Sequence, residues 1–151
     1  MKGAEVAVGS KNFTEQIILG KMAVILFKSA GADVEDLTNI PGSNSAREAM
    51  LKGDLNFQWE YTGTAWISYL GHDDPITNEQ EQYGAVLEAD RKNGLEWLPP
   101  APMNNTYGFA IPRAKAEKLG ISKLSDLARL PASERTFCVE SEFANRNDGF
   151  Q

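Results

Sequence analysis

The sequence predicts an α/β fold built around a parallel sheet. Short apolar runs of strand length alternate with stretches in which apolar residues recur at helical spacing. The order strand, helix, strand is complete within residues 4–38, and a further helix and a further alternating run follow before residue 62. This alternation is typical of βαβ units, whose strands lie parallel in one sheet.

The first βαβ unit begins with an apolar run at residues 4–8. Asn12 is placed to cap a helix, with Glu15 three residues later as its reciprocal partner. Apolar residues then recur at helical spacing until Gly31, which predicts a left-handed stop. The second strand is predicted at residues 34–38.

The next helix and strand repeat the pattern. Ser45 and Glu48 form a second predicted capping box, and the helix at residues 46–52 is expected to stop at Gly53. Residues 55–61 alternate between apolar and polar side chains, which is strand periodicity.

Two helical stretches and a stiff connection follow. Residues 64–70 predict a helical turn or two, and a longer helix is expected to begin at a Thr77–Gln80 cap and to end near Gly94. Prolines concentrate at residues 98–102, where they remove backbone donors, so this stretch suits a connection between lobes.

The remaining residues predict the opening of a second lobe. Strands are expected at residues 108–111 and 135–140, with two short helical pieces between them at 113–119 and 123–130. A loop and the start of a helix occupy residues 141–151.

Composition excludes several classes of function. The formal net charge is −6 and the sequence pI is about 4.8, which disfavours wide contact with nucleic acid. No apolar run approaches the roughly 20 residues that span a bilayer. The single cysteine, Cys138, forms no intramolecular disulfide, and its apolar neighbours predict a buried position in a strand.

Polar and aromatic residues collect where the predicted parallel strands end, which is where open α/β sheets bind ligands. Lys11 and Arg146 are suited to hold a carboxylate, and Tyr61 offers a ring face and a hydroxyl. Taken singly, Lys11 also fits a solvated loop, Tyr61 a core position, and Arg146 a surface ion pair with Asp148. Their joint placement favours a small ligand with a carboxylate and an apolar or cationic end.

The sequence offers few residues that could support an enzymatic function. No phosphate-binding or dinucleotide-binding glycine spacing follows the first strand. His72, the only histidine, lies in an acidic turn and predicts a solvated residue rather than a metal ligand. Glu140 and Glu142 fit a helix cap better than an acid–base pair, and the three tryptophans fit core packing better than ligand stacking. We expect no catalytic residue, no metal and no cofactor.

Four motifs, in this order, resemble the glycine betaine, carnitine and choline-binding proteins of ABC importers. These are type II periplasmic binding proteins, with two α/β lobes and a ligand cleft between them. The motifs are Gly9-Ser10-Lys11-Asn12-Phe13-Thr14-Glu15-Gln16, Glu60-Tyr61-Thr62-Gly63-Thr64, Asn105-Thr106-Tyr107-Gly108 and Glu142-Phe143-Ala144-Asn145-Arg146-Asn147-Asp148-Gly149.

The resemblance implies a set of ligand-binding residues. Tyr61 and Tyr107 would form two walls of an aromatic cage around a trimethylammonium group, which has no donor hydrogens and is held by ring faces. The ligand's carboxylate would be held by Lys11, Thr64 and Arg146. Asn105 matches a position where family members carry Asp or Asn, and it brings no charge. Ser43 is a weaker candidate from the loop after the second strand.

The resemblance also implies an organisation and a role. Residues 1–107 would form lobe one without its carboxyl-terminal return elements, and residues 108–151 would begin lobe two, so that the chain covers about the first half of a family member. The protein would bind a quaternary-ammonium osmoprotectant and deliver it to an ABC import permease. It would act in the periplasm or anchored outside the membrane, with its signal segment absent from this chain.

An alternative is a sensory or ligand-independent binding lobe that acts as a self-associating dimer without transport. A half-lobe exposes apolar surface and strand edges, so we expect the chain to self-associate, by swapping elements, or to belong to a longer one. In this chain we expect weak ligand binding or none.

Overall fold

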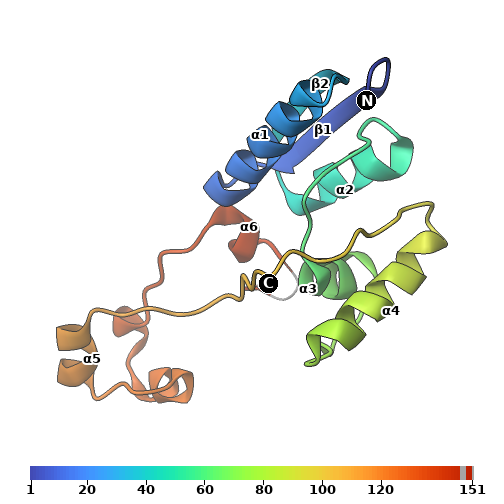
Figure 1. The fold of residues 1–151 in the computed structure, drawn as a ribbon. Helices are drawn as coiled ribbons and strands as arrows, with labels where there is room; N and C mark the ends of the chain where they lie inside the picture. The colour runs from blue at the N-terminus through green and yellow to red at the C-terminus, as the bar shows by residue number, and fades with distance from the viewer. Residues whose placement is uncertain (147–148, 151) are drawn as a thin grey trace.

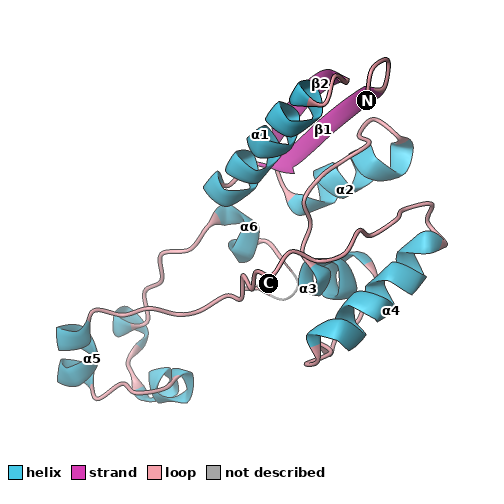
Figure 2. Ribbon diagram, viewed as in Figure 1, coloured by secondary structure: helices cyan, strands magenta, loops and turns pink. Residues whose placement is uncertain are grey.

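A computed structural model describes residues 1–146 and 149–150 of the chain. Its centre is a parallel pair of strands, β1 (Glu5–Lys11) and β2 (Asp33–Ile40), joined by helix α1 (Thr14–Ser29). Figure 1 shows α1 lying along one face of this pair, and Figure 2 shows that the strands are confined to this end of the molecule. The predicted βαβ unit is therefore confirmed.

The carboxyl end of β1 is irregular. The pairing register with β2 shifts between Gly9 and Lys11. At this point the Ser10 hydroxyl accepts a hydrogen bond of 2.9 Å from the backbone N–H of Asn39, whose φ is +77°. A side chain thus replaces a regular ladder bond, and Lys11 is set at the end of the strand.

The core lies between α1 and the strands. Val8, Ala23 and Val24 are buried and form its centre. Gly20 faces the strands so closely that an added Cβ would lie 2.8 Å from Cγ2 of Thr38 and 2.9 Å from Cβ of Ser10. The helix can approach the strands because it carries no side chain at this position.

The ends of α1 differ from the predicted cap. The helix begins after Phe13, and no side chain caps it, so the Asn12–Glu15 capping box is wrong. Glu15 is engaged by residues distant in sequence instead, as described below. The left-handed stop is confirmed, since Gly31 has a φ of +88°.

Helix α2 (Ser43–Lys52) begins three residues earlier than predicted. Gly42, with a φ of +81°, occupies the N-cap, so the Ser45–Glu48 capping box is also wrong. Glu48 forms an ion pair of 3.1 Å with Lys52 on the exposed face of the helix. The stop at Gly53 is confirmed by its left-handed conformation.

The alternating segment at residues 55–61 runs beside β1 but pairs with it at one bridge, between Val8 and Phe57. Asn56 explains in part why the segment pairs with β1 at one bridge alone. Its Oδ1 accepts a hydrogen bond of 2.8 Å from the N–H of Ala7, so a side chain takes a donor that a regular ladder would use. The third strand is therefore only partly formed.

Two short helical elements and one long helix follow. α3 (Thr62–Thr64) continues into η1 (Ala65–Tyr69), a π-helical turn, and α4 spans Glu79–Arg91. The side chain of Asn78 caps α4 by accepting hydrogen bonds from the backbone N–H groups of Gln80 and Glu81, so the cap predicted at Thr77 is wrong by one residue.

A buried ion pair joins α2 to α4. Nη1 of Arg47 donates to Oδ2 of Asp90 at 2.8 Å, and Nη2 pairs with Oδ1. Nε1 of Trp97 also donates to Asp90, at 2.7 Å. Burial by itself would raise the pKa of Asp90, but the hydrogen bonds from Arg47, Trp97 and Asn93 outweigh it and hold the pKa below its ordinary value.

The region after residue 107 is more open. The predicted helix is present as α5 (Arg113–Leu119), followed by the 3₁₀ turns η2 (Leu124–Arg129) and η3 (Ala132–Glu134) and by α6 (Ser141–Ala144). α6 lies back beside the β1–α2 body, whereas α5, η2 and η3 stand apart from it (Figure 1).

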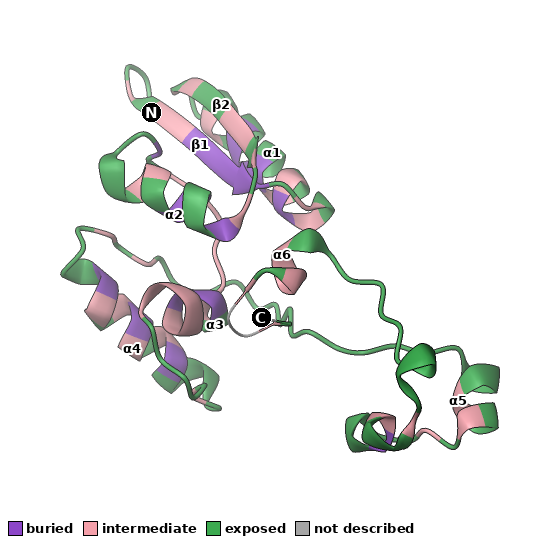
Figure 3. Cartoon of the chain, turned by 180° about the vertical axis from the view of Figure 1, so that it is seen from behind, coloured by how far each residue is buried: buried purple, intermediate pink, exposed green. Residues whose placement is uncertain are grey.

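Both strands predicted in this region are wrong. Residues 108–111 and 135–140 have no strand assignment, and they are exposed in Figure 3. Strand hydrogen bonds require a partner strand, and none forms a ladder with either segment among residues 1–146 and 149–150. For the same reason Cys138 is exposed rather than buried.

No helix within the described ranges is both long enough and apolar enough to cross a membrane.

Candidate functional site

Lys11 is buried at the carboxyl end of β1, with a relative exposure of 1%. Its Nζ lies 2.5 Å from Oε1 of Glu60 and forms an ion pair that is almost entirely shielded from solvent. The same ammonium lies 5.1 Å from the ring centroid of Tyr61 and 5.9 Å from that of Tyr69. The residue predicted to hold a carboxylate therefore already faces one carboxylate and two aromatic rings.

Tyr69 links this ion pair to the beginning of α2. Its hydroxyl lies 2.9 Å from Oε2 of Glu60, to which it donates, and 3.2 Å from the backbone oxygen of Ser43. Burial, followed by the nearby Glu60 carboxylate, raises the pKa of Tyr69 far above its ordinary value. The hydroxyl is therefore a permanent donor at this position.

Tyr61 and Asn105 meet at a carboxylate. The Tyr61 hydroxyl and the Nδ2 of Asn105 both donate to Oε1 of Glu15, the latter at 2.8 Å. Burial and the bond to Glu15 raise the pKa of Tyr61 well above its ordinary value. The ring of Phe13 stacks on that of Tyr61 at 6.2 Å. A predicted cage residue thus has its hydroxyl and its orientation fixed.

Ser43 is contacted from α6. Its backbone N–H donates to Oε2 of Glu142 at 3.2 Å, and its hydroxyl donates to Oε1. The interpretation of Glu140 as a cap of the next helix is confirmed by its position, whereas that of Glu142 is wrong. Glu140 occupies the N-cap without a side-chain bond, while Glu142 reaches the N-terminus of α2, where a negative charge is favoured.

Arg146 joins two other predicted residues. Its Nη1 donates to Oγ1 of Thr64 at 3.2 Å, and its guanidinium carbon lies 5.7 Å from the ring centroid of Tyr107. That ring lies 4.7 Å from the ring of Phe143. The surface ion pair that Arg146 was considered to form with Asp148 falls outside the described residues.

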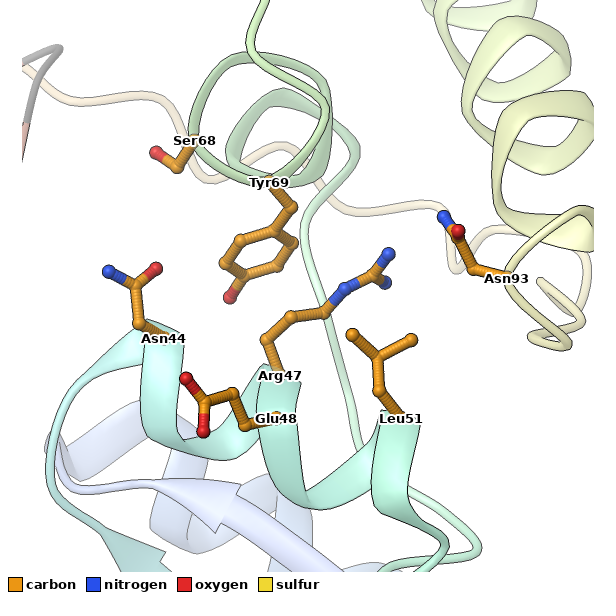
Figure 4. A pocket seen from close by; sticks show the side chains of 7 residues that line it. All are labelled: Asn44, Arg47, Glu48, Leu51, Ser68, Tyr69 and Asn93. Carbon is orange, nitrogen blue, oxygen red and sulfur yellow. The ribbon is translucent and has the colours of Figure 1, made fainter.

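Two polar cavities are lined in part by residues of α2 and η1. One, of about 350 Å³, is lined by Gly42, Ser43, Asn44, Ser45, Ser68, Glu142, Asn145 and Arg146. The second, of about 340 Å³, lies between α2 and η1 and is shown in Figure 4, where Tyr69 projects toward the α2 residues. Its lining is Asn44, Arg47, Glu48, Leu51, Ser68, Tyr69 and Asn93.

All seven predicted ligand-binding residues take part in the side-chain contacts described above, and they fall into three groups. Lys11 and Ser43 are joined through Glu60 and Tyr69. Tyr61 and Asn105 are joined through Glu15, and Thr64 and Tyr107 are joined through Arg146.

Sequence reasoning missed four residues that bond to the predicted ones: Glu15, Glu60, Tyr69 and Glu142. Glu15 was assigned to a helix cap, and Glu60 precedes Tyr61 in an alternating strand. Their position inside the quoted motifs was the available signal for Glu15, Glu60 and Glu142. Tyr69 lies outside those motifs, and only its contacts reveal it.

The remaining candidates have other surroundings. His72 is exposed, and its ring stacks on Trp66 at 3.5 Å. Trp66 and Trp97 donate their indole N–H groups to Asp74 and Asp90, respectively. Within the described part of the chain, no three His, Cys, Asp or Glu side chains are grouped in a way that could hold a metal ion.

A family model for the substrate binding domain of the ABC-type glycine betaine transport system, OpuAC, matches residues 4–151. The chain belongs to this family. The resemblance inferred from the four motifs is thereby confirmed.

Named relatives agree with this assignment. A glycine-betaine-binding protein of Pseudomonas aeruginosa is 41% identical over 150 residues, covering 94% of this chain and 48% of the relative. The glycine betaine-binding protein YehZ of Escherichia coli is 33% identical, covering 95% of this chain and 48% of YehZ. The chain spans about half the length of these relatives.

Solved structures support the predicted α/β binding-protein fold. Apo YehZ from Escherichia coli matches with a TM-score of 0.66 and 32% identity, covering 97% of this chain and 54% of that structure. A glycine betaine/carnitine/choline ABC transporter structure also has a TM-score of 0.66, at 22% identity over 84% of this chain and 47% of that structure. The second match bears on the fold alone.

Proposed function

We propose that this chain contributes a binding surface for a quaternary-ammonium osmoprotectant, of the glycine betaine, choline or carnitine type, that an ABC permease imports. The observation that carries the proposal is the meeting of Thr64, Tyr107 and Arg146. A hydroxyl, a ring face and a guanidinium from distant parts of the sequence lie within one contact group. This combination suits a ligand with a carboxylate at one end and a methylated cation at the other.

The two ends of the ligand would be held by different forces. The trimethylammonium group would lie against the faces of Tyr61 and Tyr107, because it offers no donor hydrogens and is attracted by aromatic quadrupoles. The carboxylate would take charge-assisted hydrogen bonds from Lys11 and Arg146 and a neutral one from the Thr64 hydroxyl. Glu60 forms an ion pair with Lys11, so the ligand's carboxylate would share that ammonium.

Asn105 and Ser43 would act at the edge of this site. The Asn105 amide is bonded to Glu15, and it would place the crossing segment beside Tyr61 without adding a charge. Ser43 would close the site through Glu142 of α6. These contacts support a division into two lobes, residues 1–107 and residues 108–151, with the ligand between them.

The description of the matching family, a substrate binding domain of an ABC-type transport system, supports delivery to a permease and favours transport over a sensory module without transport. This role implies that the protein is located outside the cytoplasmic membrane, in the periplasm or on a membrane anchor. Self-association is a separate proposal, supported by exposed apolar side chains such as Ile25 and Leu26 on α1.

Removal of either aromatic wall tests the function. Tyr61→Ala and Tyr107→Ala are expected to weaken glycine betaine binding at least about tenfold, because each removes a cation–π face. Nuclear magnetic resonance titration of the 151-residue chain measures even weak dissociation constants. Circular dichroism checks that each variant keeps its fold.

Tyr83→Ala is the matched control, since Tyr83 lies on α4 and donates to the carbonyl of Trp97, outside the site. Its affinity should equal that of the parent chain. Unchanged affinity in Tyr61→Ala and Tyr107→Ala would refute the cage. Failure of the parent chain to bind any quaternary ammonium would refute the proposed function of this chain.

A further inference from the structure

Glu15 has no role in the predicted ligand set, yet it lies at the centre of one of its groups. Its Oε1 accepts hydrogen bonds from the hydroxyl of Tyr61 and from the amide of Asn105. Both donors are neutral, and no cation forms an ion pair with Glu15 among residues 1–146 and 149–150. Glu15 therefore keeps an uncompensated negative charge beside the Tyr61 ring.

The charges around Tyr61 do not balance. Glu60 is neutralised by Lys11 at 2.5 Å. Adding Glu15 gives two carboxylates against one ammonium in contact with this ring or with its immediate neighbours. The excess negative charge lowers the free energy of any net cation that binds there, and it does little for a neutral molecule of the same shape.

The bond from the Tyr61 hydroxyl to Glu15 adds a second effect. A phenol that donates to a carboxylate is polarised toward its anionic form, which enriches the ring in electron density and strengthens its attraction for a cation. Tyr61 stays protonated and remains the donor, because burial and Glu15 raise its pKa. The ring of Phe13 stacks on that of Tyr61 at 6.2 Å and holds its orientation.

We propose that Glu15 is a specificity-determining residue, which selects ligands by net charge through Tyr61 and favours cationic quaternary-ammonium alcohols such as choline over zwitterions and neutral isosteres. This inference rests on the proposed function and deepens it. Glu15 acts as a positioning residue for Tyr61 and as the source of the local field.

The test compares three probes on the 151-residue chain by nuclear magnetic resonance titration. Choline carries a net positive charge, glycine betaine has none, and 3,3-dimethylbutan-1-ol is the neutral carbon isostere of choline. Glu15→Gln keeps the size of the side chain and an acceptor oxygen but removes the charge. Choline affinity is expected to fall roughly 5- to 10-fold, as one unit charge a few ångströms away produces at intermediate dielectric.

The same substitution is expected to lower the affinity for glycine betaine less than that for choline, because Glu15 repels the ligand's carboxylate while it attracts its ammonium, and to change the affinity for the neutral isostere less than about twofold. Tyr61→Phe keeps the ring and Glu15 but breaks their hydrogen bond. It is expected to lower the affinity for choline about two- to threefold, because the ring is no longer polarised by the carboxylate. Glu88→Gln, an exposed position on α4, is the charge-matched control and should leave all three affinities unchanged.

An equal loss for all three probes in Glu15→Gln would overturn charge selection and leave Glu15 a structural contact. Unchanged choline affinity would overturn it as well. If the parent chain binds none of the probes, the proposed function itself fails, and charge selection fails with it. Binding by the parent with an unchanged choline-to-betaine ratio in Glu15→Gln refutes only the inference about Glu15.

Discussion

The βαβ unit and the segment after residue 107 contain similar apolar runs, yet they fold differently. In β1, Val8 is completely buried beneath α1. In the later segment, Phe109 and Phe137 remain 48% and 46% exposed, although their rings contact each other at 5.8 Å. A strand becomes regular when a neighbour supplies both a hydrogen-bonding edge and a covering layer. The first unit contains both within 36 residues.

The largest expected effect comes from the buried ion pair that joins α2 and α4 in the first region. Asp90→Ala leaves Arg47 buried without its carboxylate and removes the acceptor of Trp97, so we expect a loss of about 3–5 kcal/mol in the free energy of unfolding. Urea unfolding followed by tryptophan fluorescence measures it. Glu96→Gln, in the exposed pair with Arg91, should leave the midpoint unchanged.

Replacing both members of the buried pair sharpens this prediction. Arg47→Met combined with Asp90→Leu should recover much of the loss, because an apolar pair avoids the buried, unpaired charge. An Asp90→Ala variant as stable as the parent would show that the contact between α2 and α4 contributes little to the first region.

A smaller effect is expected from the close approach of α1 to the strands. Gly20→Ala places a Cβ 2.8 Å from the Thr38 side chain, and the resulting displacement should cost about 1–3 kcal/mol in unfolding free energy. Gly84→Ala is the matched control on α4, where no atom lies within 4 Å of an added Cβ. It should stabilise the chain by about 0.5–1 kcal/mol. Thermal unfolding by circular dichroism distinguishes the two.

If both alanine variants gain stability, the tight packing at Gly20 does not limit the fold. If both lose stability, helix propensity does not dominate the effect of Gly84→Ala on the free energy of unfolding. Either outcome would weaken the contrast between the packed first region and the open one.

The smallest effect on stability is expected in the second region. Phe137→Ser should change the free energy of unfolding of the first region by less than about 0.5 kcal/mol, since the side chain is half exposed and its ring contacts among the described residues are with Phe109 and Phe150. Sedimentation equilibrium should show weaker self-association, because an exposed aromatic surface is reduced. Arg135→Ser, a polar substitution two residues away, should alter neither quantity.

The outcome also separates the two proposals for the exposed surface. Self-association that is unaffected by Phe137→Ser would place the contact elsewhere, for example on the apolar face of α1. A monomeric parent chain, with or without choline, would refute self-association altogether.

Local sequence patterns determined the βαβ unit, the α5 helix and the positive-φ stops at Gly31 and Gly53. These features depend on contacts within a few residues, such as helical periodicity and the steric freedom of glycine. The motifs also predicted residues that the tertiary structure brings into contact groups, such as Lys11, Tyr61 and Arg146. That these residues bind a ligand stays a prediction.

Only the tertiary structure decided which partners those residues take. Glu15 fits a capping box by spacing, yet Tyr61 and Asn105, 46 and 90 residues away, donate to its carboxylate. The predicted strands at 108–111 and 135–140 failed for a related reason. Their apolar runs resemble that of a real strand, but a strand is completed by hydrogen bonds to a neighbour, which local sequence does not encode.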